Sequence, residues 1–339
     1  MAGRYRRLSH AEALGPNAPA RLSERSAVVL GCGALGSAVA SLLARSGVGR
    51  LRLLDRDVVE ESNLADQTLY TEVDVREQRP KSEVAAARLR EVNSEIMIEA
   101  VVADFAADNA EASVAGFDLI FDATDNLRTK YLINEAAIAT GTPWVYAGCA
   151  GRLGTILPVI PTQTACLRCI WPSAPSFVDS CESMGLVPAT AFVIAGIQVT
   201  EGLKILLDQM EELNDFVLTV DVWSGRFRKL PKPALPNPDN PCPACELRQF
   251  EQLGQRRNVE ATVMCSGRAV LLSREYNPPF NYEVVANRLT TRFPVMKGPG
   301  YFSFETDGHK LFVYQSGRAL IVGTGDAPRA LTLYESIFA

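Results

Sequence analysis

The stretch that decides the fold is SAVVLGCGALG, residues 26–36. It opens with a short apolar run that is typical of a fully buried strand. Three glycines follow, Gly31, Gly33 and Gly36, and small and apolar residues then recur with a helical period. Glycines at such a position allow a tight turn and let a phosphate or a ribose approach the backbone at a helix N-terminus. The stretch therefore predicts a nucleotide-binding strand–turn–helix unit.

Strands and helices alternate around this unit. Residues 51–54 form a second apolar run that ends at Asp55, where an acidic side chain can bind ribose hydroxyls. Further strands are expected at 96–102, 117–121, 144–147, 156–160 and 216–223, and helices at 35–45, 82–92, 127–139 and 191–207. The alternation predicts an α/β fold: a Rossmann-like, mostly parallel sheet with helices on both faces. On the glycines and Asp55 alone, an NAD-dependent dehydrogenase fits at least as well as any other nucleotide-binding protein.

The chain changes character after a proline-rich segment. Six prolines lie between positions 231 and 243, and proline can neither donate to a strand ladder nor continue a helix, so an extended connector is expected over 230–245. Short strands are then expected at 262–272, 301–304, 310–314 and 318–322, with helices at 282–289 and 329–337. We predict an N-terminal domain over residues 1–250 and a small α+β domain over residues 258–339.

Composition and charge exclude several classes of protein. The net charge is −5 over 339 residues and no basic block offsets it, so no nucleic acid is expected as the main partner. The longest uncharged run, 183–200, contains polar residues and a proline, so a buried helix is expected rather than a membrane span. Residues 11–22 lack the apolar core of a secretory signal. A cytoplasmic, reducing location is therefore expected.

Four of the eight cysteines form two C-x-x-C pairs. In a reducing compartment such pairs more often hold zinc than form disulfides. Two pairs suit a closed, tetrahedral Zn²⁺ site with a structural role. Four free thiols or a redox pair are the alternatives. The expected ligands are Cys166, Cys169, Cys242 and Cys245.

Residues 55–67, DRDVVEESNLADQ, resemble the segment D-x-D-x-V-x-x-S-N-L-x-R-Q of the ThiF/MoeB/HesA family, bacterial relatives of the ubiquitin-activating enzymes. Further matches keep the family's order over residues 4–250, about three quarters of the chain. They are Arg4-Tyr5-Arg6-Arg7, Arg79-Pro80-Lys81, Asp122-Ala123-Thr124-Asp125-Asn126, and the two C-x-x-C pairs.

The resemblance implies ATP-dependent adenylation of the C-terminal glycine of a small ubiquitin-fold sulfur carrier ending in Gly-Gly, with release of pyrophosphate. Lys81 and Arg7 are the implied phosphate-binding cations, and Arg7 would act in the opposite subunit of a homodimer. Asp125 is the implied Mg²⁺ ligand, since Mg²⁺ prefers one or two carboxylates plus phosphate oxygens. The residues expected at the nucleotide are Gly31, Gly33, Gly36, Asp55, Asp57, Ser62, Asn63, Gln67, Lys81, Asp125 and Asn126.

Two positions need separate treatment. Asp66 stands where the family has arginine, so either Asp66 points away and Arg79 or Arg128 substitutes, or adenylation is weak. Cys181 lies where ThiF-like members have a cysteine that takes up the activated carrier covalently, and the chemistry would need a thiolate there. An incidental loop thiol is the alternative reading of Cys181.

The pathway implied is sulfur transfer for molybdopterin, thiamine thiazole or a related cofactor. A cysteine desulfurase or a rhodanese could supply the sulfur. A non-catalytic carrier-binding protein remains an alternative, because it would explain Asp66 and keep the fold and the zinc. A dehydrogenase would not explain Ser62-Asn63-Leu64 or Lys81. A relative that dehydrates a modified tRNA base is disfavoured by the cysteine pairs and by the missing basic patch.

Overall fold

The computed structural model describes residues 3–173, 185–235, 237, 239–254, 260–263, 267–273, 280–298 and 300–338. The chain divides into two compact units. The larger contains residues 1–100 and 104–254, and the smaller contains 101–103 and 255–339.

The larger unit is built on an eight-stranded sheet with the order β3-β2-β1-β4-β5-β6-β7-β8. Strands β2, β1, β4 and β5 pair in parallel, and β5 through β8 pair antiparallel. The expected Rossmann-like α/β fold is confirmed, and the antiparallel strands extend it at one side. The strands are β1 (Ser26–Leu30), β2 (Arg50–Asp55), β3 (Met97–Val102), β4 (Leu119–Asp122), β5 (Trp144–Ala150), β6 (Leu153–Val159), β7 (Phe216–Asp221) and β8 (Arg226–Pro231).

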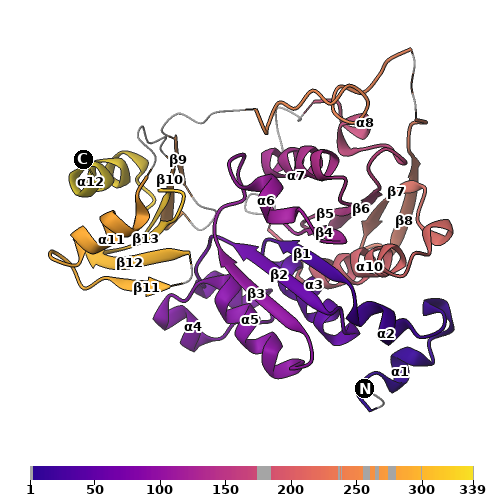
Figure 1. Cartoon of the computed structure of the whole chain (residues 1–339), viewed down its shortest axis with the longest axis horizontal. Helices are drawn as coiled ribbons and strands as arrows, with labels where there is room; N and C mark the ends of the chain where they lie inside the picture. The colour runs from indigo at the N-terminus through magenta and orange to yellow at the C-terminus, as the bar shows by residue number, and fades with distance from the viewer. Residues whose placement is uncertain are drawn as a thin grey trace. The chain divides into compact units, whose positions relative to one another are not determined.

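Helices cover both faces of this sheet (Figure 1). The helices α3, α5 and α10 pack together on one face, and α6 and α7 lie on the other. The helices are α1 (Arg6–Ser9), α2 (Ala18–Ser23), α3 (Ala34–Ser46), α4 (Glu72–Glu77), α5 (Lys81–Val92), α6 (Ala110–Val114), α7 (Leu127–Thr140), α8 (Leu167–Ile170) and α10 (Pro188–Leu206), with 3-10 turns η1 (Glu12–Leu14), η2 (Glu61–Ala65) and η3 (Met210–Glu212).

Helix α10 is the one helix of the described residues that is long and apolar enough to cross a membrane. More than half of it is buried inside the fold, where it contacts α3, β5 and β6. A Cβ added at Gly202 would lie 2.2 Å from the ring of Phe121, so the helix backbone sits directly on the sheet. Such close packing is that of a core helix in a globular protein.

The strand order places a topological switch between β1 and β4. The chain leaves β1 toward β2 on one side and later returns to β4 on the other. Ligands of open α/β sheets bind in the crevice outside the carboxyl ends of the strands at such a point. The segments that follow β1, β2 and β4 therefore meet at one edge.

The smaller unit is a six-stranded antiparallel sheet with the order β11-β12-β13-β14-β10-β9, and two helices complete it. The region expected as one strand over 262–272 is two strands, and β11 was not expected. The elements are β9 (Glu260–Val263), β10 (Ala269–Ser273), α11 (Tyr282–Leu289), β11 (Met296–Gly298), β12 (Tyr301–Thr306), β13 (His309–Tyr314), β14 (Ala319–Val322) and α12 (Ala327–Phe338).

A buried carboxylate fastens the segment after the second cysteine pair to α7. Glu135 is 1% exposed, and its two oxygens accept the backbone N–H groups of residues 251, 252 and 253 at 2.7–3.0 Å. Arg248 donates to carbonyl oxygens at the end of the same helix. The proline-rich connector is thus held at its far end by polar contacts rather than by apolar packing.

Removal of the Glu135 carboxylate should release this segment. Glu135→Ala leaves three backbone N–H groups without an acceptor, which is expected to destabilise the segment by roughly 3 kcal/mol. Trypsin should then cleave after Arg248 under conditions in which the wild type resists. Glu111→Ala, an exposed glutamate on α6, is the control, and equal cleavage of the two variants would contradict the assignment.

Candidate nucleotide site and cysteine cluster

The glycine turn after β1 is shaped by backbone packed against backbone. Gly31 has a φ of +92°, and a Cβ there would lie 2.6 Å from the carbonyl oxygen of Ala123. A Cβ at Gly36 would lie 1.9 Å from the carbonyl oxygen of Gly31. Neither position can hold a side chain. Gly33 is different, because a Cβ there would meet only the Gln67 amide at 3.9 Å, so the space in front of the α3 N-terminus is open.

Asp55, at the end of β2, anchors two turns. One oxygen accepts the backbone N–H of Cys32 at 2.6 Å and the other accepts that of Asp57 at 2.7 Å. Burial raises the pKa of the Asp55 carboxyl to about 6, and the neighbouring Asp57 carboxylate adds to the effect. Both oxygens accept backbone hydrogen bonds, so Asp55 has a structural role in holding the glycine turn. Only the remaining lone pairs of its oxygens are available to a ribose hydroxyl.

Lys81 begins α5 and points into the same edge. Its side chain is 8% exposed and its Nζ lies 3.6 Å from Asp57 Oδ2. Burial lowers its pKa, but the carboxylates of Asp57, Asp55, Glu60 and Asp125 outweigh that effect and leave the pKa raised. The ammonium therefore stays charged at neutral pH inside a strongly acidic cluster.

Asp66 and Gln67 complete this cluster. Asp66 is half-buried, burial raises the pKa of its carboxyl, and Lys81 acts in the opposite direction. The buried atoms Asp57 Oδ1, Asp66 Oδ1 and Gln67 Oε1 have no hydrogen-bond partner among the residues that the structure describes. Asp66 and Lys81 interact electrostatically, so the acidic side chain at this position adds to the negative charge around the lysine.

Arg56 is a cation at the site that the sequence motifs did not single out. Arg56 Nη1 pairs with Asp104 Oδ1 at 2.6 Å, and its charge also interacts with Asp57 and Asp125. Arg79, one candidate substitute for the family arginine, instead binds the buried carboxylate of Asp74 at 3.1 Å. The pairing with Asp104 carries no local sequence signal, because the partner lies 48 residues away.

Asp125 follows β4 on an exposed turn and interacts electrostatically with both Lys81 and Arg56. Its neighbour Asn126 caps α7, because Asn126 Oδ1 accepts the backbone N–H of Thr129 at 2.8 Å. Asn126 thus has a structural use in addition to the expected nucleotide contact.

The remaining expected residues lie on η2, on α1 or outside the described residues. Asn63 caps η2, since its Oδ1 accepts the backbone N–H of Glu60 at 2.9 Å, and Ser62 is exposed beside it. Arg7 lies exposed on α1, which Tyr5 anchors by accepting a hydrogen bond from Asn93 at 2.8 Å. Cys181 lies outside the described residues.

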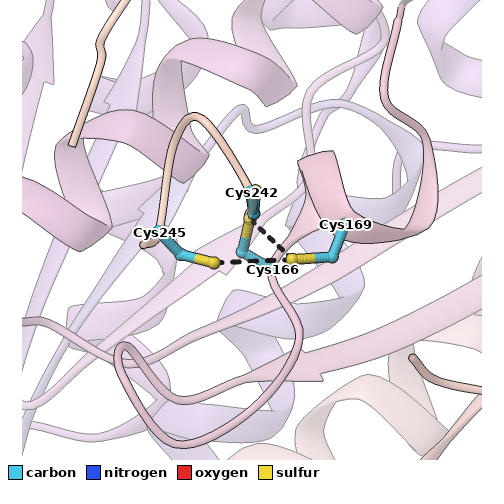
Figure 2. A group of neighbouring side chains, drawn as sticks. All are labelled: Cys166, Cys169, Cys242 and Cys245. Atoms are coloured by element: carbon cyan, nitrogen blue, oxygen red, sulfur yellow. Dashed lines mark hydrogen bonds between the residues drawn. The ribbon is translucent and has the colours of Figure 1, made fainter. Parts of the chain in front are cut away.

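The four cysteines of the two pairs come together from two segments: Cys166 and Cys169 lie at the start of and within α8, and Cys242 and Cys245 lie in a turn (Figure 2). Their sulfur atoms all lie within 4.8 Å of one another. The Cys166–Cys242 and Cys166–Cys169 sulfurs are 3.8 Å apart and the Cys169–Cys245 sulfurs 3.4 Å apart. A tetrahedral ion with thiolates at about 2.3 Å has sulfur–sulfur edges of about 3.8 Å, so the cluster could hold a metal ion.

Asn134, on α7, supports the cluster from behind. Its Nδ2 donates to Cys166 Sγ at 3.6 Å, and its Oδ1 accepts the backbone N–H of Leu167 at 2.9 Å. Such outer contacts orient a metal ligand. The cluster therefore contacts α7, the helix whose Glu135 also binds the backbone of residues 251–253.

A glycine turn, a buried lysine and several carboxylates at a topological switch point define a nucleotide-binding α/β protein suited to phosphate chemistry. The chain belongs to the ThiF family, whose model matches residues 5–244. It is 34% identical over 335 residues to the sulfur carrier protein ThiS adenylyltransferase of Bacillus subtilis, covering 98% of both chains. The smaller unit is therefore included in that similarity.

Two further relatives agree with this membership. The chain is 36% identical over 247 residues to the SAMP-activating enzyme E1 of Haloferax volcanii, covering 71% of this chain and 88% of that one. The structure of Escherichia coli MccB with ATP superposes with a TM-score of 0.61 at 22% identity, covering 69% of this chain and 72% of that one. The latter similarity shows the fold.

The sulfur geometry predicts one bound metal ion per chain. Asn134→Ala is expected to weaken metal binding by about 10- to 100-fold, because it removes the contact that orients Cys166. Cys245→Ser removes a ligand and should purify without stoichiometric metal and with a lower melting temperature. Elemental analysis and chelator competition measure both effects. Full metal content and unchanged melting of Cys245→Ser would contradict the site.

Proposed function

We propose that this protein is an ATP-dependent adenylyltransferase that activates the C-terminal carboxylate of a ubiquitin-fold sulfur carrier. The observation that carries the proposal is the buried Lys81, set among carboxylates at the switch point of a ThiF-family sheet. The whole-length similarity to a ThiS adenylyltransferase supports the same class of substrate. Family membership also sets aside the dehydrogenase alternative for the glycine turn.

In the proposed reaction a carboxylate oxygen of the carrier attacks the α-phosphorus of ATP. A carbon–oxygen–phosphorus linkage forms, the bond from the α-phosphorus to the bridging oxygen breaks, and its electron pair leaves with pyrophosphate. The protein's part is to position the reactants and to stabilise negative charge. The open space before α3 and the Lys81 ammonium serve these two needs.

The charges at the site explain why ATP would need further cations. Five carboxylates, those of Asp55, Asp57, Glu60, Asp66 and Asp125, surround or face Lys81. Arg56 is the second cation of the chain there, but it is held by Asp104. Asp125 would hold Mg²⁺, which supplies neutralisation of the phosphate oxygens and of the leaving group. Arg7 of a second copy would supply another positive charge, so we propose a homodimer.

We propose zinc as the metal of the cysteine cluster, because a closed set of four thiolates with tetrahedral edges is typical of structural Zn²⁺. A reducing, cytoplasmic location would keep these thiols available to the metal. We propose that residues 1–250 form an adenylation domain and residues 258–339 a small second domain.

Cys181 is proposed to take the activated carrier as a covalent intermediate. The acyl carbon would pass from AMP to sulfur, and AMP would leave. A cysteine desulfurase or a rhodanese would then supply sulfur for the carrier thiocarboxylate. Molybdopterin and thiamine thiazole are the candidate products of such a pathway.

Pyrophosphate exchange tests the proposed reaction. With Mg·ATP and the ThiS carrier of Bacillus subtilis, the wild type is expected to exchange labelled pyrophosphate into ATP. Lys81→Ala and Asp125→Ala are expected to lower the rate by roughly 10²- to 10³-fold, because each removes charge stabilisation at the phosphates. Glu91→Gln, an exposed change at the far end of α5, serves as the control.

The alternatives give different results in the same assay. Tight binding of the carrier without any exchange would favour a non-catalytic binding module. Exchange that proceeds equally with a carrier whose C-terminal carboxyl group is amidated would contradict attack by that carboxylate.

Asp66 should weaken the affinity for ATP. Its carboxylate interacts electrostatically with the Lys81 ammonium and is only partly buried, so screening leaves about 1 kcal/mol of the charge interaction. Asp66→Asn is expected to lower the KM for Mg·ATP by about fivefold. Glu91→Gln, the same change of charge elsewhere on the chain, should have no effect. An unchanged KM for Asp66→Asn would show that this carboxylate does not oppose nucleotide binding, and a raised KM would show that it helps to bind the nucleotide.

A further inference from the structure

A buried ammonium lies behind the turn that carries Asp125. Lys130 is on the first turn of α7 and is 4% exposed. Its Nζ donates to Asp122 Oδ2 at 2.8 Å and to the carbonyl oxygen of Ala147 at 2.7 Å. The same atom lies 4.9 Å from the centre of the Tyr146 ring. The Lys130 ammonium has no role in the proposed adenylation steps.

The partner of Lys130 also holds the turn. Asp122 ends β4 and is fully buried. While its Oδ2 binds the lysine, its Oδ1 accepts the hydroxyl of Thr124 at 2.7 Å and the backbone N–H of Thr124 at 3.0 Å. Thr124 directly precedes Asp125. One carboxylate therefore joins the lysine to the residue next to the implied metal ligand.

The turn is also packed against the glycine turn. Ala123 lies between Asp122 and Thr124, and its carbonyl oxygen is the atom that a Cβ at Gly31 would strike at 2.6 Å. The backbone N–H of Ala123 donates to the carbonyl oxygen of Leu30 at 2.9 Å. A shift of the turn would therefore move Asp125 and would also disturb the glycine turn, where the nucleotide is expected.

The charge on Lys130 is needed for this arrangement. Burial lowers its pKa, but the Asp122 carboxylate outweighs that effect and leaves the pKa raised, so the lysine is charged. Without the ammonium, Asp122 would be a buried charge with no counter-ion, which is unfavourable. Its side chain would then be free to leave the position in which Oδ1 accepts both hydrogen bonds from Thr124.

We propose that Lys130 is a positioning residue for Mg·ATP: through Asp122 and Thr124 it fixes the turn that presents Asp125 to the metal. The inference rests on the proposed function, because it assigns Asp125 to the metal-bound nucleotide. Carboxylates that bind a metal are themselves oriented by hydrogen bonds, and loss of such support commonly costs 10- to 100-fold in affinity or activity.

Calorimetric binding of Mg·ATP to the full chain, without any carrier, tests the proposal. Lys130→Met is expected to weaken binding by about 10- to 100-fold, and Lys130→Arg to restore most of it. In EDTA, the two proteins should bind ATP equally weakly, because the effect passes through the metal ligand. Lys204→Met is the matched control. It removes the ammonium that pairs with the buried Glu201 on α10, and it should leave Mg·ATP binding unchanged.

A double-mutant cycle separates positioning from stability. If Lys130 acts through Asp125, the pair Lys130→Met and Asp125→Ala should bind no more weakly than Asp125→Ala alone. Additive losses, or an equal loss with and without Mg²⁺, would overturn the proposal. Should Lys130→Met fail to fold, Thr124→Val removes the hydroxyl contact and leaves the buried pair intact, and several-fold weaker Mg·ATP binding is then required.

The same experiment separates this inference from the proposed function. A wild type that binds Mg·ATP, beside a folded Lys130→Met that binds it equally well, rejects the positioning role alone. A wild type that binds no Mg·ATP rejects the proposed function and this inference with it.

Discussion

The structure depends on one contact in which two backbone segments meet without a side chain between them. Gly31 lies against the carbonyl oxygen of Ala123, and Gly36 lies against Gly31. Because of this contact, the turns after β1 and β4 form a single surface, and Asp55 joins the turn after β2 to it through two short hydrogen bonds. Asp55, Asp57, Lys81 and Asp125 of the proposed nucleotide site belong to these turns or to the helix start beside them. A methyl group at Gly31 or Gly36 would force the turns apart and the charges with them.

The sequence predicted the parts of the fold that have a periodic pattern. The buried strands and the four long helices of the first domain, α3, α5, α7 and α10, appear where the apolar spacing placed them, with ends shifted by a few residues. The short helices α1, α2, α4, α6 and α8 were not predicted. Strand β8 was missed because all of its residues are exposed, so it has no alternating burial pattern, and it runs into the proline-rich segment that was expected to be extended. The strand over 262–272 was expected as one element because the apolar spacing there does not show where β9 ends and β10 begins.

Side-chain pairing was much harder to predict than element type. The motifs placed Asp55, Lys81 and Asp125 at one edge, because parallel strands bring their carboxyl ends together. They did not reveal that Asn126 rather than Asp125 caps α7, or that Arg79 is bound to Asp74 while Arg56 lies at the site. Such choices depend on carboxylates that come from other elements, and a single sequence carries no record of those distances. The Lys130–Asp122 pair was overlooked for another reason, since a lysine in a helical pattern is ordinarily an exposed residue.

The spacing of the cysteine pairs has a consequence for how the protein is made. Cys242 follows Cys169 by 73 residues, and β7 and β8 lie between the pairs. At about 5–20 residues per second, a ribosome needs about 4–15 s to supply the second pair after the first. If the cluster holds zinc as proposed, the first pair has only two of the four ligands until the second pair is synthesised. Closure of the metal site would then be a late step in the formation of the domain.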